Sequence, residues 1–154
     1  MTSLCCDVLN ALKGKTLVTA ESLTGGGIGA ALTGISGSSA VYKGGIISYT
    51  NEVKHRILGV SMEILDKYGA VSEPVAKAMA EGVRNLLKAD IAVSVTGLAG
   101  PGGDEYGNPV GTVFIGYSDA FITEVRHCLF NGDRESVRKQ TAEEALKLVL
   151  KHNP

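Results

Sequence analysis

Cysteine is scarce in this 154-residue sequence, and its three cysteines are poorly spaced for cross-linking. Cys5 and Cys6 are adjacent and Cys128 lies far along the chain, so neither a disulfide framework nor a zinc site is expected. The sequence also lacks HExxH, CxxC and any cluster of carboxylates at ligand spacing. We therefore expect no metal, and three reduced cysteines fit a cytoplasmic protein.

An excess of charge of either sign is also missing. Fifteen Lys and Arg residues against sixteen Asp and Glu residues leave a formal net charge of -1, so nucleic acid and acidic lipid surfaces are poor candidate partners. No stretch approaches the roughly 20 apolar residues of a membrane span, and the start of the chain lacks the apolar run of a signal peptide. A soluble protein that is not exported is expected.

What the sequence does contain is an alternation of helical and strand patterns. Its length and its 44% hydrophobic content suit one domain over residues 1–154. We expect an α/β fold, a three-layer α/β/α sandwich with a mixed, mainly parallel sheet and one antiparallel hairpin. Strands are expected at 16–20, 44–50, 91–95, 111–117 and 121–130, and helices at 3–12, 28–35, 51–60, 72–90 and after Asp133.

The stretch AESLTGGG, residues 20–27, follows the first expected strand and combines hydroxyl groups with glycines. Two interpretations stay open: Ser22 or Thr24 caps the next helix, or Ser22 is a nucleophile beside an anion-binding turn. A glycine inside a helix costs about 0.5 to 1 kcal/mol relative to alanine, and a cap alone does not require three of them. The glycines therefore favour a close approach of the backbone to some group.

A second loop, TGLAGPGG at residues 96–103, repeats this arrangement after another strand. Its glycines and proline are typical of a stiff loop whose amides bind an anion, although a plain surface turn would have the same composition. Neither loop has the lysine of a P-loop or the glycine spacing of a dinucleotide fingerprint.

A serine nucleophile needs a base, and the three histidines form no pattern with Ser22. In SYTNEVK, residues 48–54, Lys54 is a candidate base if burial lowers its pKa, and Tyr49 could relay the proton. The alternative is that Lys54 is a solvated helix residue and Tyr49 a half-buried strand residue.

Several segments, taken in order, resemble the C-terminal domain of the CinA (competence/damage-inducible) family, which includes the nicotinamide-nucleotide amidohydrolases. They run from about Thr16 to Leu150 and are TAESLTGG, SGSSAVYKGGIISYTNEVKHRILGV, GAVSEPVAKAMAEG, ADIAVSVTGLAGPGG, PVGTVFIGY and FNGDRESVRKQTAEEAL. The resemblance implies hydrolysis of the carboxamide of nicotinamide mononucleotide to nicotinate mononucleotide and ammonia, in pyridine-nucleotide salvage. It further implies a homodimer and no metal or organic cofactor.

The resemblance also implies roles for individual residues. Ser22 would be the nucleophile, Tyr49 and Lys54 the proton-transfer pair, and Thr96 a hydrogen-bonding or oxyanion-supporting group. Arg138 would hold the substrate phosphate, with Arg134 as the competing candidate. The remaining substrate-binding residues would be Thr24, Gly25, Gly26, Ser39, Gly97, Gly100 and Gly102.

Longer members of the family carry a further N-terminal domain that resembles molybdopterin-biosynthesis proteins. We expect any pyrophosphatase activity of that domain to be absent here. Two other classes of function stay open at this point: a non-catalytic nucleotide-binding or regulatory module, and a structural dimer without a ligand.

Overall fold

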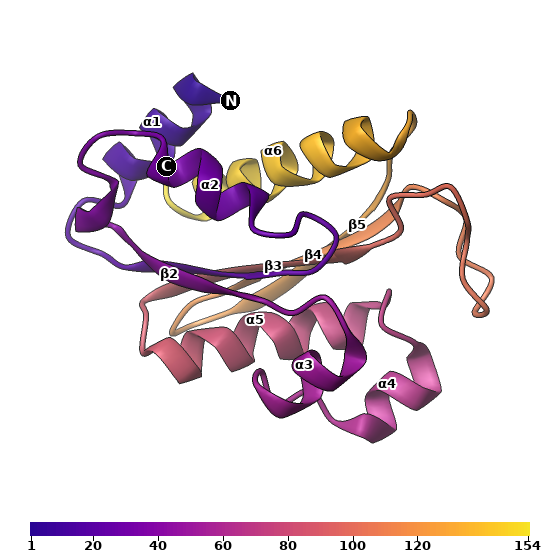
Figure 1. The fold of residues 1–154 in the computed structure, drawn as a ribbon. Helices are drawn as coiled ribbons and strands as arrows, with labels where there is room; N and C mark the ends of the chain where they lie inside the picture. The colour runs from indigo at the N-terminus through magenta and orange to yellow at the C-terminus, as the bar shows by residue number, and fades with distance from the viewer.

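Five strands form one sheet in the order β2-β1-β3-β4-β5 in the computed structural model, which describes residues 1–154 (Figure 1). The strands are β1 (Leu17–Glu21), β2 (Tyr42–Ile47), β3 (Ile91–Gly97), β4 (Thr112–Ser118) and β5 (Thr123–Leu129). β1 pairs parallel with β2 and β3, whereas β3 with β4 and β4 with β5 pair antiparallel. The sheet is mixed as expected, but it is not mainly parallel. No helix connects β3 to β4, so β4 returns antiparallel.

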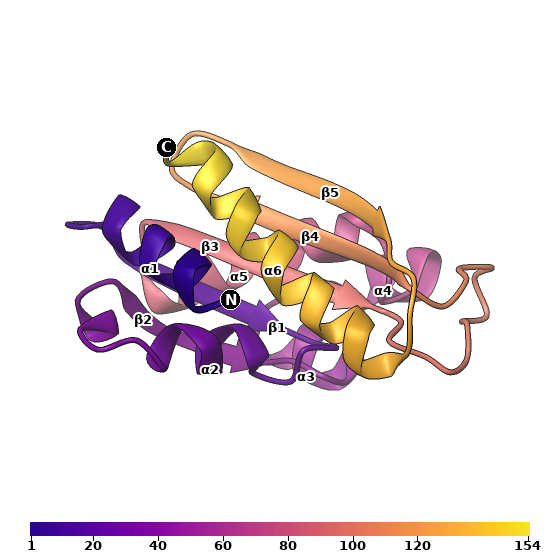
Figure 2. The same ribbon diagram turned by 90° about the horizontal axis from the view of Figure 1, so that it is seen from above.

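Helices cover both faces of this sheet, as Figures 1 and 2 show. One face carries α1 (Thr2–Ala11), α2 (Gly27–Thr33) and α6 (Arg134–His152). The other face carries α3 (Asn51–Arg56), α4 (Met62–Tyr68) and α5 (Glu73–Leu87). The three-layer α/β/α arrangement is thereby confirmed. None of the helices combines the length and the apolar character that crossing a membrane requires.

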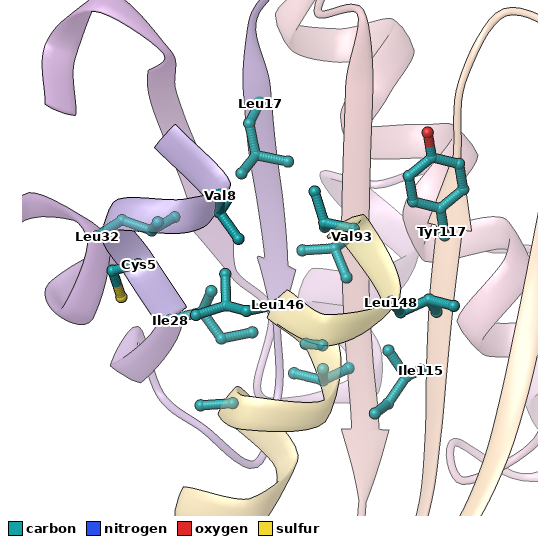
Figure 3. Packing of buried hydrophobic residues seen from close by; sticks show 14 of the residues in the cluster. Cys5, Val8, Leu17, Ile28, Leu32, Val93, Ile115, Tyr117, Leu146 and Leu148 are labelled. Carbon is teal, nitrogen blue, oxygen red and sulfur yellow. The ribbon is translucent and has the colours of Figure 1, made fainter. Parts of the chain in front are cut away.

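Two hydrophobic cores lie between these layers. The larger core has 21 buried residues and fills the space beneath α1, α2 and α6 (Figure 3), and the smaller has 10 buried residues beneath α4 and α5. Successive residues of β1 alternate between the two cores, since Leu17 belongs to the first and Val18 to the second. β1 and β3 are therefore buried on both faces, which explains their continuous apolar sequences.

The expected elements are present with shifted boundaries, and one helix was missed. β2 begins at Tyr42, and α3 ends at Arg56 because Gly59, with a positive φ of 74°, follows in the turn toward a new helix. That helix, α4, is capped by Ser61, whose side chain accepts a hydrogen bond from the Ile64 amide. It has only seven residues, too few to establish a helical period in the sequence.

Candidate functional site

A cavity of about 320 Å³ lies beyond the carboxyl ends of β1 and β3. This is the edge of an open α/β sheet where ligands usually bind, because loop amides and helix starts face outward there. The cavity is lined by Ser22, Leu23, Tyr49, Lys54, Ala70, Val71, Thr96, Gly97, Leu98, Ala99, Gly100, Gly102 and Arg134. No histidine and no carboxylate lines it.

Ser22 and Lys54 meet in this cavity although 32 residues separate them in the sequence. Ser22 follows β1, and its amide donates to the Val95 carbonyl of β3. Lys54 lies on α3, which is capped by the Thr50 side chain directly after β2. The parallel pairing of β1 with β2 brings these two turns to the same edge, and Lys54 Nζ lies 2.9 Å from Ser22 Oγ.

The Lys54 amine is almost completely buried, at 1% exposure, and has no carboxylate partner. Nζ also lies 2.8 Å from the Ser48 carbonyl and 3.2 Å from the Tyr49 carbonyl. Burial lowers the pKa of Lys54 from its usual 10.5 to about 8. The Lys54 amine donates to Ser22 Oγ and to both carbonyls; once neutral, it would keep two N–H groups for the carbonyls and have one lone pair to face the Ser22 hydroxyl. This geometry places a buried amine with a lowered pKa next to a serine hydroxyl.

The turn after Ser22 supplies an amide to the cavity, but not from the glycines that the sequence suggested. The Leu23 residue lines the cavity, and its N–H donates to no other group of the chain. The Gly25 amide already donates to the Ser22 carbonyl, and neither Gly25 nor Gly26 lines the cavity. Both glycines have positive φ, 58° and 98°, so they are needed to turn the chain from β1 into α2.

Thr24 also lies outside the cavity. Its buried hydroxyl donates to Glu21 Oε1 over 2.7 Å, on the far side of the turn from Lys54. Thr24 therefore contacts Glu21, and it is not among the residues that line the cavity. Glu21 was not among the residues expected from the sequence, although a carboxylate placed just before a glycine-rich helix start is a recognisable signal for capping.

The second glycine loop forms the opposite wall, as the sequence suggested. Thr96, Gly97, Gly100 and Gly102 all line the cavity, and Thr96 Oγ1 donates to the Ala70 carbonyl over 2.8 Å. The N–H groups of Ala99, Gly100 and Gly102 donate to no other group of the chain. This loop therefore offers several free amides to an anion.

Of the two candidate arginines, Arg134 lines the cavity and Arg138 does not. Arg134 donates to the Gly100 carbonyl over 2.7 Å and to the Tyr49 hydroxyl over 3.3 Å. Arg138 instead donates to the carbonyls of Leu23 and Thr24, at 2.9 and 3.1 Å. In this geometry Arg138 holds the turn after Ser22 through Nε and one Nη and does not line the cavity, so the geometry favours Arg134 for contact with a ligand in the cavity.

Of the two remaining expected site residues, Tyr49 lies at the cavity and Ser39 does not. Tyr49 lines the cavity with 58% of its surface exposed, and its hydroxyl contacts Arg134 rather than Lys54 or Ser22. Ser39 is exposed in a short 3-10 turn (Ser38–Ala40) that precedes β2. Because β2 runs parallel to β1, the beginning of β2 lies at the opposite edge of the sheet from Ser22. Within one chain Ser39 does not reach the cavity.

The histidines all have partners elsewhere. His55 Nδ1 contacts the Val60 carbonyl, and the His127 ring stacks on Phe114. His152 is the last residue of α6 and contacts Glu124. The only side-chain amine that contacts Ser22 is therefore that of Lys54.

Comparison with known proteins gives consistent results over nearly the whole chain. The family described as the CinA C-terminal domain matches residues 2–152. A CinA-like protein of Sulfurihydrogenibium is 49% identical over 135 residues, which are 88% of this chain and 34% of that protein. A putative competence-damage inducible protein of Desulforudis audaxviator is 44% identical over 89% of this chain and 33% of that protein. The chain spans about a third of the length of these curated relatives.

Solved structures match the fold closely. The competence damage-inducible protein A of Klebsiella pneumoniae has a TM-score of 0.95 at 38% identity, covering 98% of this chain and 96% of that one. The competence/damage inducible protein CihA of Agrobacterium tumefaciens has a TM-score of 0.96 at 37% identity, covering 99% and 95%.

Proposed function

Because the chain belongs to the CinA C-terminal domain family, we propose that it is an amidohydrolase that converts nicotinamide mononucleotide to nicotinate mononucleotide and ammonia. The observation that carries this proposal is the contact between Ser22 Oγ and the buried amine of Lys54. A serine hydroxyl becomes a useful nucleophile only beside a base, and an amine with a lowered pKa can be that base near neutral pH.

In the proposed acylation step, Ser22 Oγ attacks the carboxamide carbon while its proton moves to Lys54 Nζ. The transfer is direct over 2.9 Å, so it does not require the relay through Tyr49 that the sequence left open. The carbonyl oxygen becomes an oxyanion, and the free N–H of Leu23, a residue of the nucleophile turn that lines the cavity, is its proposed donor. One such donor is typically worth about 2.7 to 4 kcal/mol at the transition state.

Ammonia then leaves with the proton that Lys54 returns, and Ser22 remains as an ester of the nicotinate carbonyl. Water attacks this ester while Lys54 accepts a proton from it, and the second product is nicotinate mononucleotide. The two carbonyls that hold the amine, those of Ser48 and Tyr49, keep Lys54 Nζ in place through both steps.

The rest of the cavity fits a substrate with a phosphate at one end. Arg134 and the free amides of the loop at residues 98–102 are donors for the phosphate oxygens. The exposed ring of Tyr49 offers an aromatic face to the positively charged nicotinamide ring. We also propose that the protein is a homodimer in a cytoplasmic salvage pathway and that neither nucleic acid nor a membrane is its partner.

Ammonia release from nicotinamide mononucleotide, followed across pH, tests this proposal. Only the neutral form of Lys54 can accept the serine proton. Since the pKa of Lys54 is about 8, we expect kcat/KM to rise about tenfold per pH unit below pH 8 and to level off above about pH 9. A coupled ammonia assay and chromatographic detection of nicotinate mononucleotide measure the rate. No ammonia at pH 9 would refute the proposed activity, and a flat profile from pH 6 to 9 would remove Lys54 as the base.

Arg134→Met tests the phosphate site. Loss of a charge-assisted hydrogen bond of about 1.5 to 3 kcal/mol should raise KM for nicotinamide mononucleotide roughly 10- to 100-fold. Hydrolysis of nicotinamide riboside, which lacks the phosphate, should change little. Lys139→Met removes a charge from an exposed position on the same helix and is the matched control. An equal effect on both substrates would show that Arg134 does not recognise the phosphate.

A further inference from the structure

Glu21 is a buried carboxylate, 2% exposed, that has no basic partner. It is instead held by four donors, two for each oxygen. Oε1 accepts from Thr24 Oγ1 at 2.7 Å and from the Ile28 amide at 2.8 Å. Oε2 accepts from Thr19 Oγ1 at 3.1 Å and from the Gly29 amide at 3.0 Å.

These donors come from three successive segments of the chain. Thr19 is on β1, Thr24 is in the turn after Ser22, and Ile28 and Gly29 are in the first turn of α2. The positive end of the α2 dipole and its unpaired amides thus receive a carboxylate of the protein itself. The glycine-rich start of α2 is therefore already occupied, and it is not available for the phosphate of a substrate.

Glu21 and Ser22 are adjacent but are directed to opposite faces of the sheet. Along β1, Leu17, Thr19 and Glu21 share the face of α2, as the contact of Glu21 with α2 shows. Ser22 follows Val18 and Ala20 on the opposite face, where it contacts Lys54 on α3. Of the four groups that donate to the Glu21 carboxylate, only the Thr24 hydroxyl belongs to the turn that follows the nucleophile, so this hydrogen bond ties that turn to the carboxylate.

We propose that Glu21 is a positioning residue for Ser22, acting through the Thr24 hydroxyl on the turn that contains the nucleophile. This inference rests on one part of the proposed function, namely that Ser22 is the nucleophile. Thr24 is the link between the carboxylate and the turn, because its hydroxyl is the only turn group that Glu21 accepts from. Thr19 donates to the same carboxylate from the strand, so its bond fixes Glu21 without touching the turn.

The test compares Thr24→Val with Thr19→Val, because each removes one hydrogen bond to Glu21 at nearly constant volume. Thr19→Val also removes the 2.8 Å contact between Thr19 Oγ1 and the Tyr42 hydroxyl, so it disturbs the structure at least as much and is a strict control. The probe is phenylmethanesulfonyl fluoride, which reports on Ser22 without nicotinamide mononucleotide. Ser22 Oγ forms a bond to sulfur, the sulfur–fluorine bond breaks, fluoride leaves, and Lys54 takes the serine proton. Intact mass gives the labelling rate at pH 8, and thermal unfolding gives the stability of each variant.

We expect Thr24→Val to slow labelling of Ser22 at least about tenfold and Thr19→Val to slow it less than about twofold, with similar losses of thermal stability. Thr24→Ser, which keeps the hydroxyl, should restore the rate. With nicotinamide mononucleotide, Thr24→Val should lower kcat and leave KM unchanged.

Equal slowing by the two valine variants would overturn the inference, because a general loss of stability would then explain both. Absence of labelling in the parent protein would also overturn it, since Ser22 would not be a positioned nucleophile. Labelling of the parent without ammonia release would refute the proposed amidohydrolase activity, while the difference between the two valine variants would still decide the role of Glu21.

Discussion

Ser22→Ala is expected to lower kcat for ammonia release by at least about a thousandfold while the protein stays folded and binds nicotinamide mononucleotide. The substitution removes only the hydroxyl group, whose oxygen would form the bond to the carboxamide carbon. Loss of the nucleophile from a nucleophile–base pair removes the acyl-enzyme route altogether, so only binding and the oxyanion donor remain to assist water. The phosphate contacts proposed for Arg134 are untouched, so affinity for the nucleotide should be nearly unchanged.

Ser94→Ala is the matched control for this experiment. Ser94 is also buried and also at a strand, but its hydroxyl donates to the Ala76 carbonyl of α5 and it does not line the cavity. Ammonia release should survive this change. If the parent binds the nucleotide without releasing ammonia, and Ser22→Ala binds it equally well, the protein is a nucleotide-binding module in which Ser22 has no chemical role.

Lys54→Met is expected to abolish ammonia release to a similar extent and to leave the protein as stable as the parent or more stable at pH 7. A pKa lowered from 10.5 to about 8 means that folding keeps the amine in a site that disfavours its charge. At pH 7 this disfavours the folded state by about 3 kcal/mol. Loss of the hydrogen bonds to two carbonyls and to Ser22 offsets part of the gain, at about 1 kcal/mol each.

The sign of the pH dependence follows from the direction of the shift. A group with a lowered folded pKa contributes its full stability above the unfolded pKa, near 10.5, and loses it as the pH falls to about 8. Methionine does not titrate. As the pH falls from 10.5 to about 8, the parent loses stability, so the stability of Lys54→Met relative to the parent should increase. Thermal unfolding across this range measures it. Lys67→Met, at an exposed site on α4, should show no such trend.

A Lys54→Met protein that keeps full activity would show that another group accepts the Ser22 proton. A variant that is both inactive and unfolded would show that the amine holds the turn of Ser48 and Tyr49 in place. Activity and thermal stability therefore need to be measured on the same preparation.

In the histidine-free site, the sequence pointed to two residues, Ser22 and Lys54, that the structure brings into contact. The absence of any histidine pattern left Lys54 as the candidate base, and the structure does bring Lys54 Nζ to Ser22 Oγ. Sequence spacing could not establish that contact. It depends on the parallel pairing of β1 with β2, which brings the carboxyl ends of the two strands, Glu21 and Ile47, side by side.

For the glycine stretch at residues 25–27, the structure differs from the interpretation that the sequence suggested. Its composition correctly indicated an anion at the start of a helix, but the anion in the structure is Glu21 of the protein itself. Gly25 and Gly26 provide the left-handed backbone of the turn instead of facing the cavity. Arg134 and Arg138 lie one turn apart on α6, and the sequence could not decide between them because their partners, the Gly100 carbonyl and the carbonyls of Leu23 and Thr24, are brought near α6 only by the fold.

The sequence by itself determined the layers of this protein, because the periods of apolar residues decide which segments become strands and helices. It also determined the residue types of the site, because hydroxyls, glycines and one lysine restrict the chemistry. Only the tertiary structure decided which of two adjacent residues, Glu21 or Ser22, faces the cavity. It also decided which arginine lies in it and whether Lys54 is buried. These depend on how separate segments pack against one another, and a burial that lowers the pKa of an amine arises only when they do.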